Sequence, residues 1–193
     1  MISVLDENCA CVDTDFLIHV AETKCAAIDL LKYLAIAFEK LCLCGVMHPL
    51  IYEKELPQDT PVIQQVFEAQ IIQVVDLDAL FSGEDGEARK AYYSFLVPEL
   101  FKKLKGEKLP VEDIFNEWKR KCSFGEVHSI ALCLVFGCRL FLSDDSDSKQ
   151  LRKFIDSDLA TFEVLTRKDF FNSHELGNEI PRPIRRQLSH ARV

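Results

Sequence analysis

The sequence predicts an α/β fold with a mainly parallel central sheet and helices on both faces. Short apolar runs alternate with longer segments whose apolar residues recur at helical spacing, which is typical of strands joined by crossover helices. The expected strands are residues 10–13, 71–77, 139–143 and 161–165. The first and third lead directly into aspartates, at the edge where parallel sheets bind their ligands.

The expected helices lie between these strands. Residues 25–42 have apolar side chains at helical spacing, and Pro49 and Pro61 lie where two further helices begin. A buried helix is expected between Gly125 and Gly137, because glycine commonly ends helices. The acid-rich segment after residue 143 should open another helix, since acids in a first turn suit the helix dipole.

Residues 83–122 interrupt this alternation and predict a helical insertion or cap, which either adds packing or closes over a site. Pro98 is expected to kink or split its first helix, and a second amphipathic helix is expected after Pro110. We expect one domain over residues 1–172. Residues 173–193 lose the apolar periodicity and predict a basic tail that either binds RNA or is disordered.

The composition excludes an overall basic footprint for nucleic acid. The chain has 193 residues, a formal net charge of −8 and a pI of about 5.2. An acidic protein can still contact phosphates through metal ions or one local basic face. The N-terminus does not predict a signal peptide and no apolar run is long enough to cross a bilayer, so we expect a cytoplasmic protein with no membrane association.

Eight cysteines raise the question of disulfides or zinc. The pairs Cys9/Cys11 and Cys42/Cys44 could form a four-thiolate zinc site. Their spacing is shorter than that of structural zinc sites and both pairs lie in apolar runs, so reduced core cysteines are favoured.

Acidic residues gather where the expected strands end. Burying an unpaired carboxylate costs several kcal/mol, so acids at such positions are either exposed or paired with a cation. The acids concerned are Asp13, Asp15, Glu53, Glu55, Glu126, Asp144, Asp145 and Asp147. Helix capping is the rival interpretation for Glu126 and the three later aspartates, and a solvated helix face is the rival for Glu53 and Glu55.

The segments "VDTDFLIH", "GEVHSIAL" and "RLFLSDD", in this order, resemble the PIN-domain family of metal-dependent ribonucleases, which includes toxins of toxin–antitoxin pairs. The resemblance covers roughly residues 9–172 and implies a PIN-like nuclease domain that hydrolyses RNA. It implies Mg²⁺ or Mn²⁺ as cofactor, which fits the hard oxygen ligands that both ions prefer.

The resemblance also assigns roles to individual residues. Catalytic metal ligands would be Asp13, Glu126, Glu55 or alternatively Glu53, and Asp144 and Asp145, of which either could lead. Residues with supporting or alternate roles would be Asp15, His128 and Asp147, and His128 stands where related members often have a second glutamate.

A local basic surface is expected on the insertion. Lys102, Lys103, Lys105, Lys119 and Arg120 lie near the aromatic residues Tyr92, Tyr93 and Trp118, a combination that could grip phosphates and stack bases. The alternative is an ordinary solvated helix face. RNA is the expected partner, with an antitoxin or other inhibitor protein and a second copy of the chain as further candidates.

Three other functions remain open. "DTD" is also the motif of haloacid-dehalogenase-type phosphatases, with Asp13 as nucleophile and Asp15 as general acid. That family expects Gly-Thr soon after the motif, whereas this chain has Phe16 and Leu17. The others are a catalytically silent PIN-like binding module and an interaction protein whose acids are helix caps.

Overall fold

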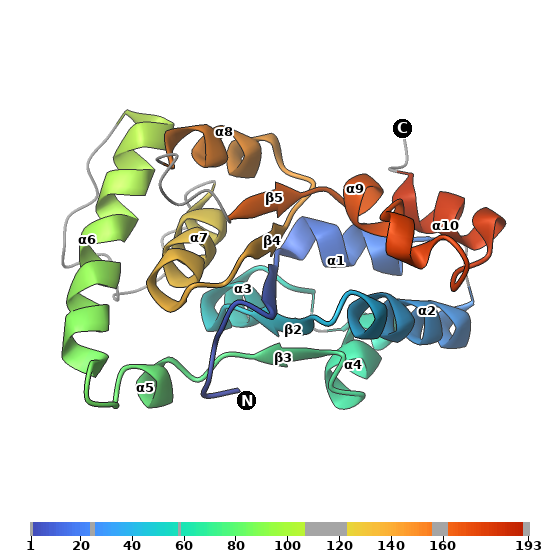
Figure 1. Cartoon of the computed structure of the whole chain (residues 1–193), viewed down its shortest axis with the longest axis horizontal. Coiled ribbons are helices and arrows are strands. Elements are labelled where there is room, and N and C mark those ends of the chain that lie inside the picture. The colour runs from blue at the N-terminus through green and yellow to red at the C-terminus, as the bar shows by residue number, and fades with distance from the viewer. Residues whose placement is uncertain (1, 24–25, 58, 107–122, 156–161, 191–193) are drawn as a thin grey trace.

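The fold is α/β with a parallel central sheet and helices on both faces, as the sequence predicts. The computed structural model describes residues 2–23, 26–57, 59–106, 123–155 and 162–190 (Figure 1). Five parallel strands lie in the order β3-β2-β1-β4-β5. Their bounds are Cys9–Val12 (β1), Cys44–Met47 (β2), Ile72–Val74 (β3), Leu140–Leu142 (β4) and Glu163–Leu165 (β5).

The helices follow the strands in the expected order. They are α1 (Thr14–Ala21), α2 (Ala27–Lys40), α3 (Pro49–Lys54), α4 (Pro61–Glu68), α5 (Leu77–Leu80), α6 (Gly86–Lys105), α7 (Phe124–Phe136), α8 (Ser146–Phe154), α9 (Arg167–Phe171) and α10 (Arg182–Ser189), with a short 3₁₀ helix at His174–Leu176. No described helix combines the length and apolar character needed to cross a bilayer.

Among the described strands, β2 is the one that was not expected from the sequence. It has four residues, CGVM, and its glycine weakens the strand signal. Gly45 is required there, because a Cβ atom would lie 2.7 Å from the carbonyl oxygen of Ile71. The close approach of the backbone at Ile71 therefore explains why this strand contains a glycine, a residue that is unfavourable in strands.

Both faces of the sheet are covered, and β1 shows this most directly. Cys9 and Cys11 belong to the core that α6, α7 and α8 cover, whereas Ala10 and Val12 belong to the core that α1, α2, α9 and α10 cover. Figure 1 shows these two helix groups on opposite sides of the strands. All four residues of β1 are buried, as expected for a central parallel strand.

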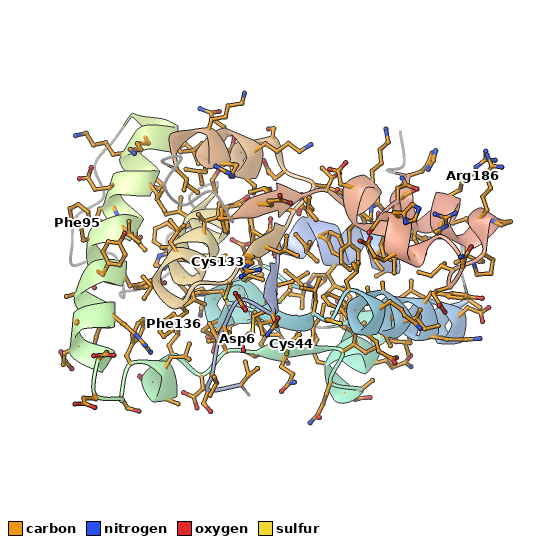
Figure 2. The ribbon with its side chains drawn as sticks, viewed as in Figure 1. Asp6, Cys44, Phe95, Cys133, Phe136 and Arg186 are labelled. Carbon is orange, nitrogen blue, oxygen red and sulfur yellow. The ribbon has the colours of Figure 1, made fainter. Side chains whose placement is uncertain are left out.

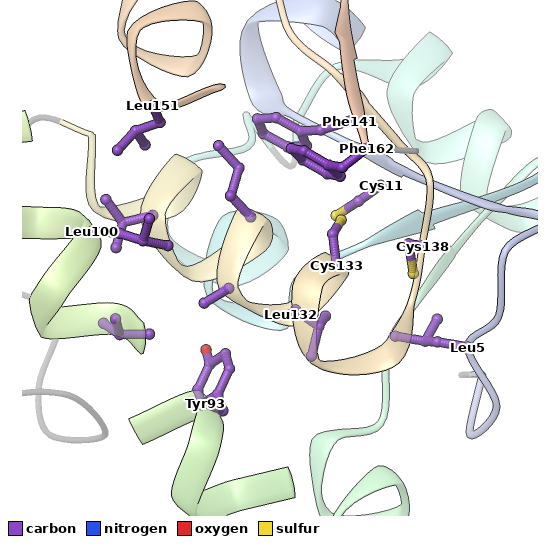
Figure 3. Packing of buried hydrophobic residues seen from close by; sticks show 14 of the residues in the cluster. Leu5, Cys11, Tyr93, Leu100, Leu132, Cys133, Cys138, Phe141, Leu151 and Phe162 are labelled. Atoms are coloured by element: carbon purple, nitrogen blue, oxygen red, sulfur yellow. The ribbon is translucent and has the colours of Figure 1, made fainter. Parts of the chain in front are cut away.

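The insertion is built around α6, which packs along α7. Figure 3 shows Tyr93 and Leu100 pointing from α6 toward that helix, and both side chains are buried. The predicted split at Pro98 is wrong, because α6 is one helix through the proline. Buried residues on both sides of Pro98, including Val97 and Phe101, hold the helix against the core and offset the cost of about 3 kcal/mol for an interior proline. The second predicted helix, after Pro110, lies outside the described residues.

The segment expected as a basic tail packs on the domain up to His190. It forms α10, and Leu176, Ile180 and Leu188 are buried in the core beside α2 and α9. Arg186 of α10 faces outward at the edge of the molecule (Figure 2), whereas the Nε atom of Arg185 is buried. The amphipathic pattern of this short helix was hidden by its prolines and arginines.

The cysteines follow the core interpretation. Cys9, Cys11, Cys133 and Cys138 are buried thiols, and Cys44 lies beside Cys9 on the neighbouring strand. Cys42 is exposed and does not join them.

Candidate active site

The carboxylate of Asp13 lies at the point where β1 ends and α1 begins. Asp13 is the N-cap of α1, and its Oδ1 accepts a hydrogen bond from the backbone N–H of Thr14 at 2.8 Å. The hydroxyl of Ser143, at the end of β4, donates to Asp13 Oδ2 at 2.9 Å. The side chain is 2% exposed, so adjacent strands hold an almost fully buried acid at the carboxyl edge of the sheet.

Asp15 lies beside Asp13 and faces the same strand end. Its Oδ1 is 3.4 Å from Ser143 Oγ and accepts a hydrogen bond from the backbone N–H of Asp144 at 3.3 Å. The "DTD" motif therefore places both carboxylates against the residues that follow β4, and neither points away into solvent.

Glu55, and not Glu53, reaches this edge. Glu55 is the C-cap of α3, and its Oε2 accepts a hydrogen bond from the Thr14 hydroxyl at 3.2 Å. Its carboxylate also lies against Gly125, where a Cβ atom would come within 2.8 Å of Oε2. The glycine in "FGE" therefore leaves room for Glu55 at the start of α7. Glu53 lines a separate pocket on the other side of α3.

Glu126 completes a group of four acids with Asp13, Asp15 and Glu55. It lies in the first turn of α7 and is 8% exposed. Burial, together with the charges of Glu55, Asp145 and Asp15, raises the pKa of Glu126 to about 7. We call Asp13, Asp15, Glu55 and Glu126 the acid cluster.

The other members of the acid cluster titrate in the same direction. Burial is the main reason why the pKa values of Asp13, Asp15 and Glu55 are raised. The charges of Glu126 and Asp15 raise the pKa of Asp13 as well, and that of Asp15 raises the pKa of Glu55. These four groups thus repel one another when charged, which an added cation would relieve.

Asp144 is engaged in an ion pair with a buried arginine. Its carboxylate accepts hydrogen bonds from the backbone N–H of Arg167 at 2.9 Å and from Arg167 Nε at 3.1 Å. His19 Nδ1 lies 3.1 Å from Asp144 Oδ2. Arg167 is 2% exposed and its Nη1 donates to the carbonyl oxygen of His19 at 2.7 Å, so Asp144 compensates a charge that the fold buries.

Asp145 and Asp147 are both bound locally. Asp145 is the N-cap of α8 and accepts a hydrogen bond from the N–H of Asp147 at 2.6 Å, as the capping interpretation predicts. Asp147 accepts from Lys105 Nζ at 2.7 Å and from the Ser123 hydroxyl. Asp145 still contributes charge at Glu126, whereas Asp147 is turned toward α6.

His128 does not join the acids. It is buried, and its Nδ1 lies 2.5 Å from the hydroxyl of Tyr93, which in turn lies 2.9 Å from Nε2 of His48. This also corrects the expectation that Tyr93 stacks on RNA, since Tyr93 is fully buried, whereas Tyr92 is 47% exposed. Tyr92 and Tyr93 are consecutive residues of α6, and the rotation of the helix from one residue to the next places Tyr93 in the core and Tyr92 on the surface.

The basic residues predicted on the insertion are partly described. Lys102, Lys103 and Lys105 lie in the last turn of α6, and Lys105 joins that turn to the start of α8 through Asp147. The end of α6 is therefore close to the carboxyl edge of the sheet. Lys119, Arg120 and Trp118 lie outside the described residues.

The acid cluster has the oxygen ligands that suit Mg²⁺ or Mn²⁺, but its side chains are not arranged as a complete coordination sphere. Among the residues that the structure describes, no three His, Cys, Asp or Glu side chains already stand in an arrangement that holds a metal ion. Asp13 and Glu55 are held by hydrogen bonds to Thr14, and Asp144 by Arg167. Buried oxygen ligands that repel one another nevertheless fit a hard cation.

Three residues that position the acids were not predicted from the sequence. Ser143 could have been found as the residue between the strand "LFL" and the two aspartates, and Thr14 as the centre of "DTD". The sequence around Arg167 does not indicate its role, because its partner Asp144 is 23 positions away.

Comparisons of the chain with protein-family models, with curated proteins and with solved structures found no match.

Proposed function

We propose that this protein is a divalent-metal-dependent endonuclease that hydrolyses RNA, with the acid cluster as its active site and a PIN-like domain as its scaffold. The observation that carries the proposal is the convergence of Asp13, Asp15, Glu55 and Glu126 at the carboxyl edge of the sheet, with the pKa of each raised by burial. A structural role alone does not explain why two buried and two half-buried acids gather at one edge of the sheet, where their charges raise the pKa values of Asp13, Glu55 and Glu126.

The proposed cofactor is Mg²⁺ or Mn²⁺, held by Asp13, Glu55 and Glu126, with Asp145 as the nearest additional carboxylate. When bound, such an ion lowers the pKa of a water nucleophile and stabilises charge on the phosphate oxygens. Asp144 is less suited to this role than the resemblance implies, because Arg167 and His19 already engage both of its oxygens.

The chain's own groups would orient the site. The N–H of Thr14 and the hydroxyl of Ser143 fix the carboxylate of Asp13, and the hydroxyl of Thr14 fixes Glu55. Lys102, Lys103 and Lys105 supply positive charge near the same edge and are proposed to contact RNA phosphates. We also propose a cytoplasmic location, which rests on the sequence of the N-terminus, and an inhibitor protein of the antitoxin kind, which rests on the family resemblance. A second copy of the chain is a further proposed partner.

The test is cleavage of single-stranded RNA in Mn²⁺ by the wild-type protein and by Asp13→Asn. We expect cleavage that depends on the metal and falls at least about a hundredfold in the variant, because the substitution removes a carboxylate from the centre of the site. Asp78→Asn, at an acid on α5 outside the acid cluster, is the matched control and should cleave like the wild type.

A small aryl phosphate in Mg²⁺ is assayed in parallel. Hydrolysis of this ester without RNA cleavage would replace the nuclease with the phosphatase alternative. If neither substrate is cleaved and Mn²⁺ does not change the melting temperature, the protein is a binding module and the enzyme proposal fails.

A further inference from the structure

A second site lies on the opposite side of α3 from the acid cluster. It is a pocket of about 320 Å³ between α3, the end of α4 and the edge strand β3. Ligand pockets in proteins run from roughly 300 to 1,000 Å³, so this one suits a single ring system better than a large cofactor.

The lining combines an aromatic wall with polar side chains. Tyr52 and Phe67 pack edge to face, with ring centroids 4.8 Å apart, and form the apolar part of the lining together with Ile72. Glu53 and Gln73 line the same pocket from α3 and β3. An aromatic surface next to a carboxylate and an amide is the chemistry that stacks a nucleobase and hydrogen-bonds its edge.

Gln70 adds a third polar side chain at a position where the backbone favours glycine. Its φ is +56°, and it ends α4 with the N–H of Ile71 bonded to the carbonyl oxygen of Val66 at 3.0 Å. Glycine adopts this left-handed helix end without strain and is the usual residue there. The helix end alone therefore does not explain a glutamine, whereas its side chain lines the pocket.

The pocket and the acid cluster share one short helix. Tyr52 and Glu53 face the pocket, and Glu55, two residues further on, accepts the hydrogen bond from Thr14 in the acid cluster. Two residues span about 3 Å along a helix axis, and a helix with its side chains is about 10 Å across. A nucleotide next to the scissile phosphate can reach from one site to the other.

We propose that this pocket is a base-binding subsite that selects a base carrying an exocyclic amino group. The inference rests on the proposed RNA cleavage and adds its substrate preference. Glu53 accepts hydrogen bonds only, so it favours the amino groups of adenine, cytosine and guanine, and it repels the carbonyl oxygens that uracil presents in their place. The Gln70 and Gln73 amides can donate and accept, and complete the contact with the base edge.

Nucleoside binding tests the subsite without cleavage or metal. The ¹⁵N-labelled full-length protein in a chelator is titrated with adenosine, cytidine, guanosine and uridine, and the side-chain amide signals of Gln70 and Gln73 are followed. We expect the amino-bearing nucleosides to bind more tightly than uridine. Glu53→Gln should reduce that preference about tenfold, and Tyr52→Ala should weaken every nucleoside about tenfold.

Two controls keep the test independent of folding. Glu68→Gln removes a charge from α4 outside the pocket and should leave binding unchanged. Tyr52→Phe retains the ring and should bind nucleosides like the wild type, so the comparison stands if Tyr52→Ala does not fold.

The outcomes separate this inference from the proposed function. RNA cleavage with no nucleoside response at Gln70 and Gln73 overturns the base subsite and leaves the nuclease intact. Uridine binding as tight as that of the other nucleosides overturns the selection by Glu53. Nucleoside binding that follows the expected order supports the subsite, and if RNA is not cleaved in Mn²⁺ the nuclease proposal fails separately.

Discussion

Protonation of the Glu126 side chain should change the free energy of unfolding measurably. Its pKa in the folded metal-free protein is about 7, against 4.5 for an unperturbed glutamate. Below both values the folded and unfolded states are equally protonated. Between pH 4.5 and 7 the unfolded state releases its proton first, so the free energy of unfolding falls as pH rises and levels off above 7.

We therefore expect the metal-free protein to lose up to roughly 3 kcal/mol of stability from this group between pH 4.5 and 8. Asp13, Asp15 and Glu55 change in the same direction. Urea unfolding across this pH range, in a chelator, measures the slope. Glu126→Gln should flatten it, whereas Glu39→Gln, at an exposed position on α2, should not. Stability that rises over this range would mean that the acids are not buried together.

Three elements meet at the buried His48–Tyr93–His128 chain. The N–H of Leu50 donates to His48 Nδ1, so neutral His48 carries its proton on Nε2 and donates to the hydroxyl of Tyr93. Tyr93 then donates to His128 Nδ1. Burial lowers the pKa of His48 to about 3 and that of His128 well below its usual value, which keeps both rings neutral. These hydrogen bonds link α3, whose C-cap is Glu55, to α7, which has Glu126 in its first turn.

Tyr93→Phe keeps the ring and removes this link. We expect a loss of about 1–3 kcal/mol, because His48 Nε2–H and His128 Nδ1 lose their partner in a buried place. For a domain of this size the melting temperature should fall by roughly 2–12 °C. Tyr92→Phe is the matched control, since the neighbouring tyrosine is 47% exposed and should melt unchanged. Equal melting of the two variants would show that the hydroxyl of Tyr93 does not contribute.

The C-terminal segment belongs to the whole molecule's packing. Leu176, Ile180 and Leu188 are buried in the same core as Phe170, Phe171 and the apolar side chains of α2, so residues beyond 172 close one of the two cores. Removal of an unpacked basic tail would not change the stability of the domain, whereas removal of this segment would expose one of its cores.

Truncation after Asn172 should therefore prevent cooperative folding. Each of the three buried side chains contributes about 1.5–3 kcal/mol, and together they approach the total stability of a domain. Calorimetry of the truncated chain should show no sharp transition. As a milder version, Leu188→Ala should cost about 2–5 kcal/mol and Gln187→Ala, at its exposed neighbour, almost nothing. A truncated chain that melts like the full one would restore the tail interpretation.

The sequence by itself determined the fold class, the order of four strands and of the longer helices, and the placing of Asp13 and Asp144 at strand ends. These features are local, because a strand or helix repeats its buried face at a fixed period within a few residues. The tertiary structure decided that Glu55 faces the acid cluster and that Glu53 faces a separate pocket. It also decided that Tyr93 is buried and that Arg167 forms an ion pair with Asp144. It also decided that Ser143 contacts Asp13, 130 positions away in the chain. Such contacts depend on how the strands cross and on which face of each helix packs inward, and no spacing within a single segment specifies them.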